Sequence, residues 1–381
     1  MARTADAVVV GGGIQGVAVA YQMASRGLRP LVVEQGYLAS GSTGRCAAGV
    51  RQQWGTEMNV LLARASIKMF ERMEEELDYP RGIEFKQRGY LILAYHERQW
   101  EQFLRNVALQ RSLGVPVEVL SPEGAREIVP YLNVEGVVGA TFCPEDGHIN
   151  PFRAVEAYAR AAVRLGAEMW TFTRVTGIVV EGGRVVAVHT TRGDISTPVV
   201  VNTAGPWSDQ VARMAGLEIP TYAQRHQILV TEPVGPVQGP MVISFFHGVY
   251  CQQTPHGSFI MGLGDPHEPR NLDCGATWRF LEEMAAIVTK MMPPLAELRV
   301  VRQWAGSYDM TPDAQPILGP APEVEGYYYS VGFSGHGFML APMTGKLLAQ
   351  LIAGEEPDLP VDRLGPTRFA RGELIQEPSV V

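Results

Sequence analysis

Hydrophobic residues recur along the chain in two periods, and the points where the period changes separate helices from strands. A short apolar run over 7–10, a helical pattern over 17–24 and a second apolar run over 31–33 predict strand, helix and strand at the start. Longer helices are predicted over 58–77 and 97–113. The other predicted elements are a strand within 83–94, a short helix from Pro122 that ends before Pro130, a helix over 150–165, strands over 169–180, 185–190, 199–201, 227–231, 241–245, 249–253 and 259–263, a helix over 277–291, strands over 298–305 and 327–331, and a helix over 343–353.

The order of these elements predicts an α/β fold with a second, α+β domain. Strand, glycine turn and helix open the chain, an apolar strand returns in the middle, and strand, glycine loop and helix recur near the end, which is typical of a Rossmann-like domain that is discontinuous in sequence. Short strands with turn residues between them, from 222 to 264, predict an antiparallel sheet for the substrate-binding domain. We assign 1–80, 146–215 and 311–358 to the nucleotide-binding domain, 81–145 and 216–310 to the substrate-binding domain, and 359–381 to a peripheral C-terminal tail.

The first strand leads directly into a dinucleotide-binding pattern, Gly11-Gly12-Gly13-Ile14-Gln15-Gly16. Gly11 permits the tight turn, Gly13 lets the backbone approach a pyrophosphate, and Gly16 lets helix and strand pack closely. Glu34 closes the second strand and is placed to accept hydrogen bonds from a ribose hydroxyl. An ordinary glycine-rich turn is the alternative. The pattern alone does not distinguish FAD from NAD.

Three other segments carry candidate chemistry. The polar, glycine-rich stretch 36–49 is expected to wrap a bound cofactor, and Arg51 just beyond it is a candidate for binding a substrate carboxylate, although a surface arginine is the commoner case. Small residues at 202–207 would let a ligand approach the backbone at the end of a strand. In the loop 332–338, the amides near Gly335 and Gly337 could face a flavin ring or phosphates.

Composition narrows the class of protein. The 381 residues are 46% hydrophobic and 19% charged, with a net charge of −8, which disfavours nucleic acid and acidic membranes as partners. The four cysteines are scattered, so neither a zinc site nor a disulfide framework is expected, and no metal is predicted. We expect a cytoplasmic protein, because no apolar stretch approaches the ~20 residues of a membrane span and the first strand begins too early for a signal peptide.

Together with the Gly11 motif and Glu34, these segments resemble the D-amino-acid-oxidase-type FAD amine oxidoreductases, up to about residue 355. Within that group the sequence is most similar to the β subunits of heteromeric sarcosine oxidase and of dye-linked L-proline dehydrogenase. The motifs that carry the resemblance occur in the family's order: Gly41-Ser42-Thr43, Ala204-Gly205-Pro206-Trp207, Thr311-Pro312-Asp313 and Gly332-Phe333-Ser334-Gly335-His336-Gly337-Phe338.

The resemblance implies FAD and a two-electron oxidation of the C–N bond of a secondary amino acid, L-proline or sarcosine. Hydride would pass to flavin N5, giving an imine, and the electrons would go to an acceptor that the sequence does not identify. Positioning and desolvation of a neutral amine would carry most of the catalysis. One alternative is a D-amino-acid or glycine oxidase-type deaminase. A non-enzymatic alternative is an electron-transfer or structural subunit of a flavoprotein complex.

The same resemblance assigns roles to individual residues. Arg51 aligns with the arginine that holds the substrate carboxylate in monomeric sarcosine oxidase, whereas the deaminase branches place their arginine where this chain has Tyr308. The candidate catalytic residues are Arg51, His336, Tyr250 and Tyr308. His336 is the candidate donor to the reduced flavin, with a buried structural histidine as the alternative. Tyr250 and His247 are pocket candidates, with a packing or surface role as the alternative. The expected cofactor contacts are Gly11, Gly13, Ile14, Gln15, Gly16, Glu34, Gln35, Ser42, Thr43, Arg45, Val175, Ala204, Gly205, Trp207, Gly332, Gly335, His336, Gly337, Phe338 and Met339.

Four departures from the family pattern refine these expectations. Gly306 stands where monomeric sarcosine oxidase tethers FAD through a cysteine, so FAD should be noncovalent. The oxygen-activating lysine falls near Ile260, where the chain has none, which favours an acceptor other than oxygen. Met339 replaces a second carboxylate-binding lysine and would suit a ring such as that of proline. Pro151 replaces the histidine that tethers FMN, so any FMN at a subunit junction would be held noncovalently. The protein could form a hetero-oligomer or a homo-oligomer. A partner subunit could associate it with the inner face of the membrane.

Overall fold

The strand β2 (Ala7–Val10) lies inside a six-stranded sheet in the order β19-β20-β13-β2-β3-β9. The computed structural model describes residues 3–377. Neighbouring strands in this sheet are parallel, except for the edge strand β19, which pairs antiparallel with β20. The other strands are β3 (Pro30–Val33), β9 (Glu168–Trp170), β13 (Val200–Asn202), β19 (Ile317–Pro320) and β20 (Tyr327–Val331). The predicted Rossmann-like α/β arrangement is confirmed.

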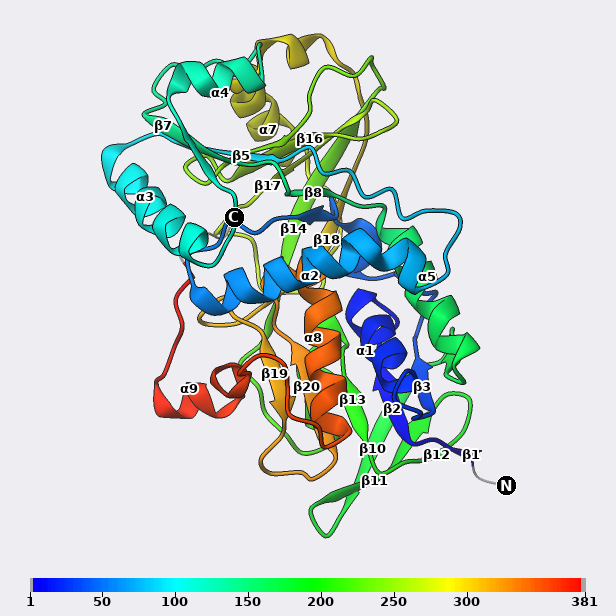
Figure 1. Cartoon of the computed structure of the whole chain (residues 1–381). Helices are drawn as coiled ribbons and strands as arrows, with labels where there is room; N and C mark the ends of the chain where they lie inside the picture. The colour runs from blue at the N-terminus through cyan, green and yellow to red at the C-terminus, as the bar shows by residue number, and fades with distance from the viewer. Residues whose placement is uncertain (1–2, 378–381) are drawn as a thin grey trace.

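Alternate side chains of β2 enter two different cores. Ala7 and Val9 pack with residues of the helices on one face, whereas Val8 and Val10 pack against a four-stranded sheet on the other. Figure 1 shows α1 beside α8, with α2 running across them. The helices are α1 (Ile14–Ala24), α2 (Glu57–Glu76), α5 (Pro151–Arg164) and α8 (Gly337–Ile352), and the four-stranded sheet contains β1 (Arg3–Thr4), β12 (Ile195–Ser196), β11 (Arg184–Thr190) and β10 (Val175–Glu181).

The predicted single strand over 169–180 is wrong, because this run forms two strands in different sheets. Between β9 and β10 the chain turns at Phe172, whose φ is +50°. Thr173 then donates its N–H to the carbonyl of Glu34 at 2.8 Å. The turn carries the chain from the parallel sheet to the four-stranded sheet, and hydrophobic periodicity does not reveal such a change of sheet.

A second region is built on an eight-stranded sheet in the order β18-β14-β17-β16-β15-β5-β7-β6. Its pairs are antiparallel as predicted, except that β5 and β15 run parallel. One face packs on α4 and α7, and the other carries Tyr90, Ile243 and Tyr250. The elements are β5 (Tyr90–Ala94), β6 (Glu118–Leu120), β7 (Gly139–Cys143), β14 (Tyr222–Thr231), β15 (Met241–Ser244), β16 (Val249–Gln253), β17 (Phe259–Leu263), β18 (Val300–Met310), α3 (Glu97–Ser112), α4 (Pro122–Ile128) and α7 (Trp278–Met291).

Several short elements complete the fold. They are the two-stranded sheet β4 (Gly49–Val50) and β8 (Gly147–His148), the short helix α6 (Ser208–Met214) and the 3₁₀ turns η1 (Ser42–Arg45), η2 (Gly205–Trp207), η3 (Pro293–Glu297) and η4 (Asp362–Leu364). The domain boundaries assigned from the sequence stay a prediction.

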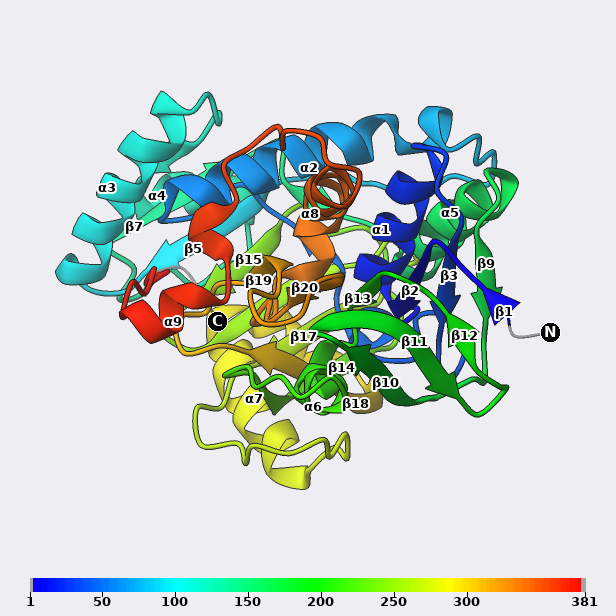
Figure 2. The same ribbon diagram turned by 90° about the horizontal axis from the view of Figure 1, so that it is seen from below.

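The C-terminal segment is not peripheral as expected. Arg368, in α9 (Thr367–Arg371), is buried and forms an ion pair with the buried Asp313 at 2.8 Å. Leu364 is part of the main hydrophobic core. Figures 1 and 2 both place α9 beyond β19, from where the chain turns back toward the rest of the molecule. The segment therefore belongs to the folded body.

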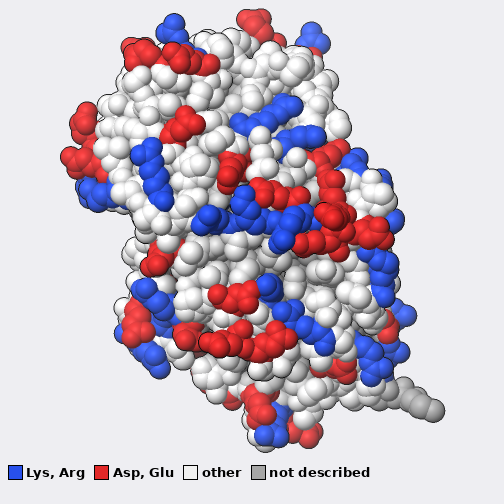
Figure 3. Space-filling model, in the orientation of Figure 1, with Lys and Arg blue, Asp and Glu red and all other residues white. Residues whose placement is uncertain are grey.

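Charged side chains of both signs are interspersed on the face shown in Figure 3. Ion pairs also lie along α2 and α5, including Arg72 with Glu76 and Arg160 with Glu156. Within residues 3–377, no helix is long and apolar enough to cross a bilayer.

Candidate active site

A cavity of about 350 Å³ lies between the loops of the parallel sheet and the inner face of the eight-stranded sheet. Of the residues predicted from the sequence, Gly16, Gly332 and His247 do not line it. The wall includes the other residues predicted from the sequence, namely Gly11, Gly13, Ile14, Gln15, Glu34, Gln35, Ser42, Thr43, Arg45, Arg51, Val175, Ala204, Gly205, Trp207, Tyr250, Tyr308, Gly335, His336, Gly337, Phe338 and Met339. Their roles toward a ligand stay predictions.

The turn after β2 requires glycine at two positions. Gly11 has a φ of +114°, and a Cβ there would lie 2.6 Å from the carbonyl oxygen of Thr203. A Cβ on Gly16 would lie 1.9 Å from the carbonyl oxygen of Gly11. Real Cβ atoms do not approach other atoms so closely, so a side chain at either position would displace the backbone.

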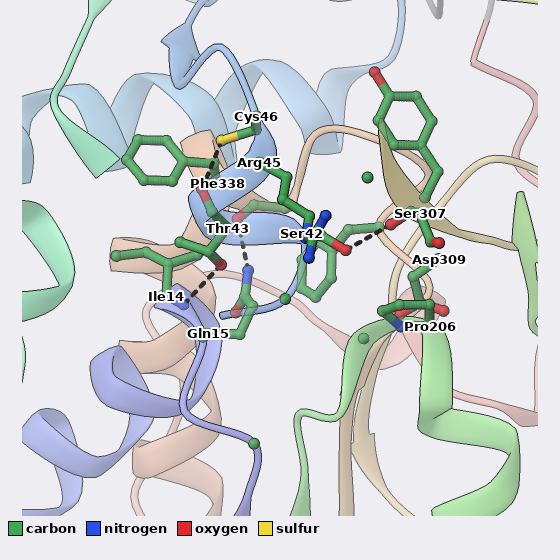
Figure 4. Close-up of a pocket in the computed structure, with 18 of the residues that line it drawn as sticks. Ile14, Gln15, Ser42, Thr43, Arg45, Cys46, Pro206, Ser307, Asp309 and Phe338 are labelled. Atoms are coloured by element: carbon green, nitrogen blue, oxygen red, sulfur yellow. Dashed lines mark hydrogen bonds between the residues drawn. The ribbon is translucent and has the colours of Figure 1, made fainter. Parts of the chain in front are cut away.

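Two helix N-termini meet at the cavity. The N-cap of α1, Gly13, makes no side-chain cap bond, and Ile14 donates its N–H to Thr43 Oγ1 at 3.1 Å. Gln15 Nε2 donates to the carbonyl of Gly337 at 2.8 Å, which ties α1 to the start of α8 (Figure 4). The first-turn amides and dipoles of two helices therefore favour negative charge at this wall.

Helix α8 begins at Gly337, six residues before the start predicted at 343. Pro342 lies inside the helix. The proline interrupts the helical pattern of the sequence, but it does not end the helix. Just before the helix, Gly335 has a φ of +94°, and a Cβ there would lie 2.6 Å from Cε2 of Tyr308. The earlier start brings the helix N-terminus to the cavity.

Glu34 is held in place by backbone donors. Its Oε2 accepts the N–H of Gly12 at 2.7 Å, and its Oε1 accepts the N–H of Gly36 at 2.7 Å. The hydroxyl of Ser40 also donates to Oε1, at 3.3 Å. The carboxylate is thus fixed at the cavity wall, with lone pairs left for a ligand hydroxyl.

The loop that contains Ser42 and Arg45 is fastened to β18. Ser42 Oγ donates to the carbonyl of Ser307 at 2.6 Å (Figure 4), and Arg45 donates from its guanidinium to the carbonyl of Ala305 at 3.1 Å. The indole N–H of Trp304 donates to the carbonyl of Arg45 at 3.0 Å. These side chains join the two regions of the molecule across the cavity.

Arg51 is buried at the cavity wall, with 5% of its surface exposed. Its Nη1 donates to the carbonyl of Gln53 at 2.6 Å, and its Cζ lies 3.7 Å from the ring centroid of Trp54. Phe245 approaches from another side, at 5.5 Å. Burial lowers the pKa of Arg51, yet an arginine stays protonated, so the site presents a desolvated cation in aromatic surroundings.

A buried polar network supports the segment from Arg51 to Trp54. Asp146 accepts the N–H of Gln52 at 2.8 Å and the side-chain amide of Gln53 at 3.1 Å. Gln110 donates to the carbonyl of Trp54 at 2.8 Å. Burial raises the pKa of Asp146 to about 7. Sequence reasoning missed this network, because its members come from distant segments.

Three rings of the eight-stranded sheet stack along the cavity wall. The ring of His226 lies 4.4 Å from that of Tyr308, at 9°, and 5.6 Å from that of Tyr250, at 12°. Burial lowers the pKa of His226 to about 4, so its imidazole is neutral. The predicted strand began one residue after His226. Counting back two positions from the buried Ile228 would have placed the histidine on the same face.

His336 precedes α8 and is 2% exposed. Its ring lies 4.7 Å from the ring of Trp54. Among the described residues, neither ring nitrogen has a hydrogen-bond partner. Burial, with a further contribution from Arg51, lowers its pKa to about 3, so the ring is neutral and has one N–H to donate.

His247 was a pocket candidate, but it lies outside the cavity wall. Its Nδ1 is 2.9 Å from Ser244 Oγ, and its ring packs against Tyr95 and Phe246 at 4.6 and 4.8 Å. It belongs to the turn between β15 and β16, so the strand periodicity that places Tyr250 on the cavity face does not extend to it.

Asp309 lines the cavity and was not predicted. Its Oδ2 accepts the N–H of Gly332, whereas its Oδ1 has no partner among the described residues. Burial raises its pKa to about 8. A buried, protonated carboxyl group at the wall is able to donate a hydrogen bond to a ligand.

Cations and thiols are few in the wall. Of the four lysines, all in the described part of the chain, none lines the cavity. Cys46 lines it, with a pKa that burial raises to about 11. A Cβ on Gly306 would lie 3.2 Å from the Cβ of Arg45, so this position is tightly packed. Within residues 3–377, no group of three or more His, Cys, Asp or Glu is arranged to hold a metal ion.

Comparisons with known proteins agree with this geometry. A family described as FAD dependent oxidoreductase matches residues 6–351. The sarcosine oxidase subunit beta of Arthrobacter sp is 33% identical over 98% of this chain and 93% of its own length. The L-proline dehydrogenase of P. horikoshii is 40% identical with a TM-score of 0.94, covering 98% of this chain and 100% of that one. The glycine oxidase of Geobacillus kaustophilus is 25% identical with a TM-score of 0.88, over 96% and 99% of the two chains.

Proposed function

The chain belongs to the DAO family of FAD-dependent oxidoreductases, and we propose that it oxidises the C–N bond of a secondary amino acid, L-proline or sarcosine. It is an FAD-dependent amino acid oxidoreductase. The relatives named for sarcosine and L-proline support this choice of substrate. The observation that carries it is a buried arginine, Arg51, in the aromatic wall of the cavity that fits the cofactor.

The residues of the cavity fit FAD. The N-termini of α1 and α8 offer amides and dipoles for a pyrophosphate, and Gly13, the N-cap of α1, brings no side chain to the wall there. Glu34 is fixed for a ribose, and His336 has buried ring nitrogens aimed at no described residue. FAD, when bound, supplies the two-electron acceptor. With Gly306 at the tether position, we propose that it is held noncovalently.

The substrate side of the site would orient a carboxylate and keep out water. Arg51 would bind the carboxylate through its planar guanidinium. The rings of Trp54, Tyr250 and Tyr308 would surround the carbon skeleton. Because burial keeps His226 and His336 uncharged, neither ring repels the arginine. An apolar wall of this kind favours the neutral amine that hydride loss requires.

We propose that the electrons pass to a redox partner other than oxygen. No lysine lines the cavity in the described part of the chain, so the wall lacks an ammonium that would stabilise reduced oxygen. The similarity to a protein named as a beta subunit supports assembly with further subunits, where a noncovalent FMN would also fit. Free thiols at all four cysteines suit a cytoplasmic location.

The test is anaerobic reduction of the purified, FAD-loaded protein by L-proline, sarcosine and D-alanine. L-Proline or sarcosine should bleach the visible flavin absorbance. Bleaching by D-alanine alone would favour the deaminase alternative, and no bleaching by any amine would contradict an enzymatic role for the isolated chain. In acid-denatured protein, yellow colour should separate from the polypeptide; colour that stays attached would contradict noncovalent binding.

A further inference from the structure

The C-terminal segment reaches the start of α2 through the side chain of Glu377. This side chain is 6% exposed. Its Oε1 accepts the N–H of Gly55 at 2.8 Å, and its Oε2 accepts bonds from Thr56 Oγ1 at 2.8 Å and from Asn59 Nδ2 at 2.9 Å. Gly55 and Glu377 are 322 positions apart in the chain. In Figure 1 the chain rises from α9 toward α2 and α3.

Glu377 binds the residues at the start of α2. The N-cap residue, Thr56, makes no side-chain cap bond of its own, and its hydroxyl donates to Glu377 instead. A carboxylate at a helix N-terminus is favoured by the helix dipole. The carboxylate therefore ties the start of α2 to the C-terminal segment.

The residues that Glu377 binds follow soon after the proposed substrate anchor. Trp54 immediately precedes Gly55, and the guanidinium of Arg51, four positions before Gly55, lies against the Trp54 ring. Asp146 holds this segment on one side and Gln110 on another. Glu377 adds an attachment at the C-terminal end of the segment.

Glu377 also influences Arg51 electrostatically. Burial lowers the pKa of Arg51, and Glu377 is the largest of the charges that oppose this effect. A negative charge near Arg51 would weaken the binding of a second carboxylate. Removal of Glu377 consequently has two opposite effects, because a displaced arginine binds the substrate more weakly and an uncompensated arginine binds it more tightly.

We propose that Glu377 is a positioning residue of the substrate site, which holds the segment from Arg51 to Trp54 in the geometry that binds a carboxylate. This inference rests on the proposed function of Arg51. Of the two effects, the positional one dominates, because one carboxylate satisfies a backbone amide and two side chains at the helix end. The C-terminal segment is then a functional part of the site.

The experiment measures binding of 2-furoate and of methyl 2-furoate to the FAD-loaded protein, from changes in the flavin spectrum. Glu377→Ala should raise the Kd for 2-furoate about tenfold and leave the Kd for the ester unchanged. Glu377→Gln, which keeps the size and one acceptor, should show a smaller loss. Glu373→Ala, at an exposed position of the same segment, is the matched control and should match wild type.

Each other result contradicts the inference. Tighter binding of 2-furoate by Glu377→Ala would show that Glu377 acts as a counter-charge. A lower melting temperature with an unchanged Kd in both variants would show a purely structural role. If Arg51→Ala loses 2-furoate binding while both Glu377 variants keep it, the proposed function stands and the role of Glu377 fails. If wild type does not distinguish 2-furoate from its ester, the carboxylate site itself fails.

Discussion

The two walls of the cavity are built from different parts of the polypeptide. The wall next to α1 and α8 is largely backbone, with glycines at positions that a Cβ would block and amides at two helix N-termini. The opposite wall is made of side chains, with Arg51 and Trp54 against the stacked rings of the eight-stranded sheet. A backbone wall suits a cofactor common to a whole family, whereas a wall of side chains can change with the substrate.

The largest expected effect is at the backbone wall. Gly11→Ala adds a Cβ 2.6 Å from the carbonyl oxygen of Thr203 at a φ of +114° and should lower FAD affinity at least ~100-fold, measured by titration of the flavin-free protein. Gly193→Ala is the matched control, because its φ is +120° and nothing lies within 4 Å of the added atom. It should cost only ~1 kcal/mol of stability. Equal FAD binding by both variants would contradict the backbone account.

The next effect concerns a side chain that links the two walls. His336→Phe removes the neutral ring N–H and should slow anaerobic flavin reduction by about 10- to 100-fold. His247→Phe, outside the cavity, should change the rate less than about twofold by the same argument. Stopped-flow absorbance measures both rates. Because the pKa of His336 is lowered to about 3, the wild-type rate should show no titration of this ring between pH 5 and 9. A His336-dependent inflection in that range would contradict the neutral ring.

The smallest effect is on stability and involves Asp309, a side chain of β18 in the eight-stranded sheet. Burial raises its pKa from 3.8 to about 8, so the folded state holds its proton more tightly than the unfolded state. This stabilisation is complete below about pH 4 and is lost as the pH rises through 8. Asp309→Asn lacks this loss, so relative to wild type its free energy of unfolding should rise by ~1–2 kcal/mol between pH 7 and 8.5. Urea unfolding at a fixed FAD concentration measures the difference. A constant difference across this range would refute the raised pKa.

The difference between the backbone wall and the side-chain wall also explains which features the sequence could predict. The turn at Gly11 and the acid Glu34 were predictable, because the turn, helix and strand that position them are contiguous. The start of α8 was placed six residues late, because Pro342 obscures the helical pattern although the helix tolerates it. This error is local, because a proline six positions into the helix accounts for it.

The side-chain wall depends on contacts between distant segments. His226 was missed because its role comes from stacking with Tyr308 on the neighbouring strand β18 and with Tyr250 on β16, which β17 separates from the strand of His226. The tail appeared peripheral, although Arg368 pairs with Asp313 and Glu377 reaches Gly55. The periodicity of a single sequence does not encode such pairings. The role of Arg51, by contrast, was predicted because the family resemblance aligned it with a carboxylate-binding arginine.

The most direct test of the proposed function compares L-proline with its methyl ester in wild type and Arg51→Ala. The rate of anaerobic flavin bleaching is measured for the four combinations, with FAD bound throughout. Wild type should prefer L-proline over the ester by about 100-fold or more in kcat/KM, and Arg51→Ala should lose most of that preference by slowing only the carboxylate substrate. An equal preference in both proteins would contradict Arg51 as the carboxylate anchor.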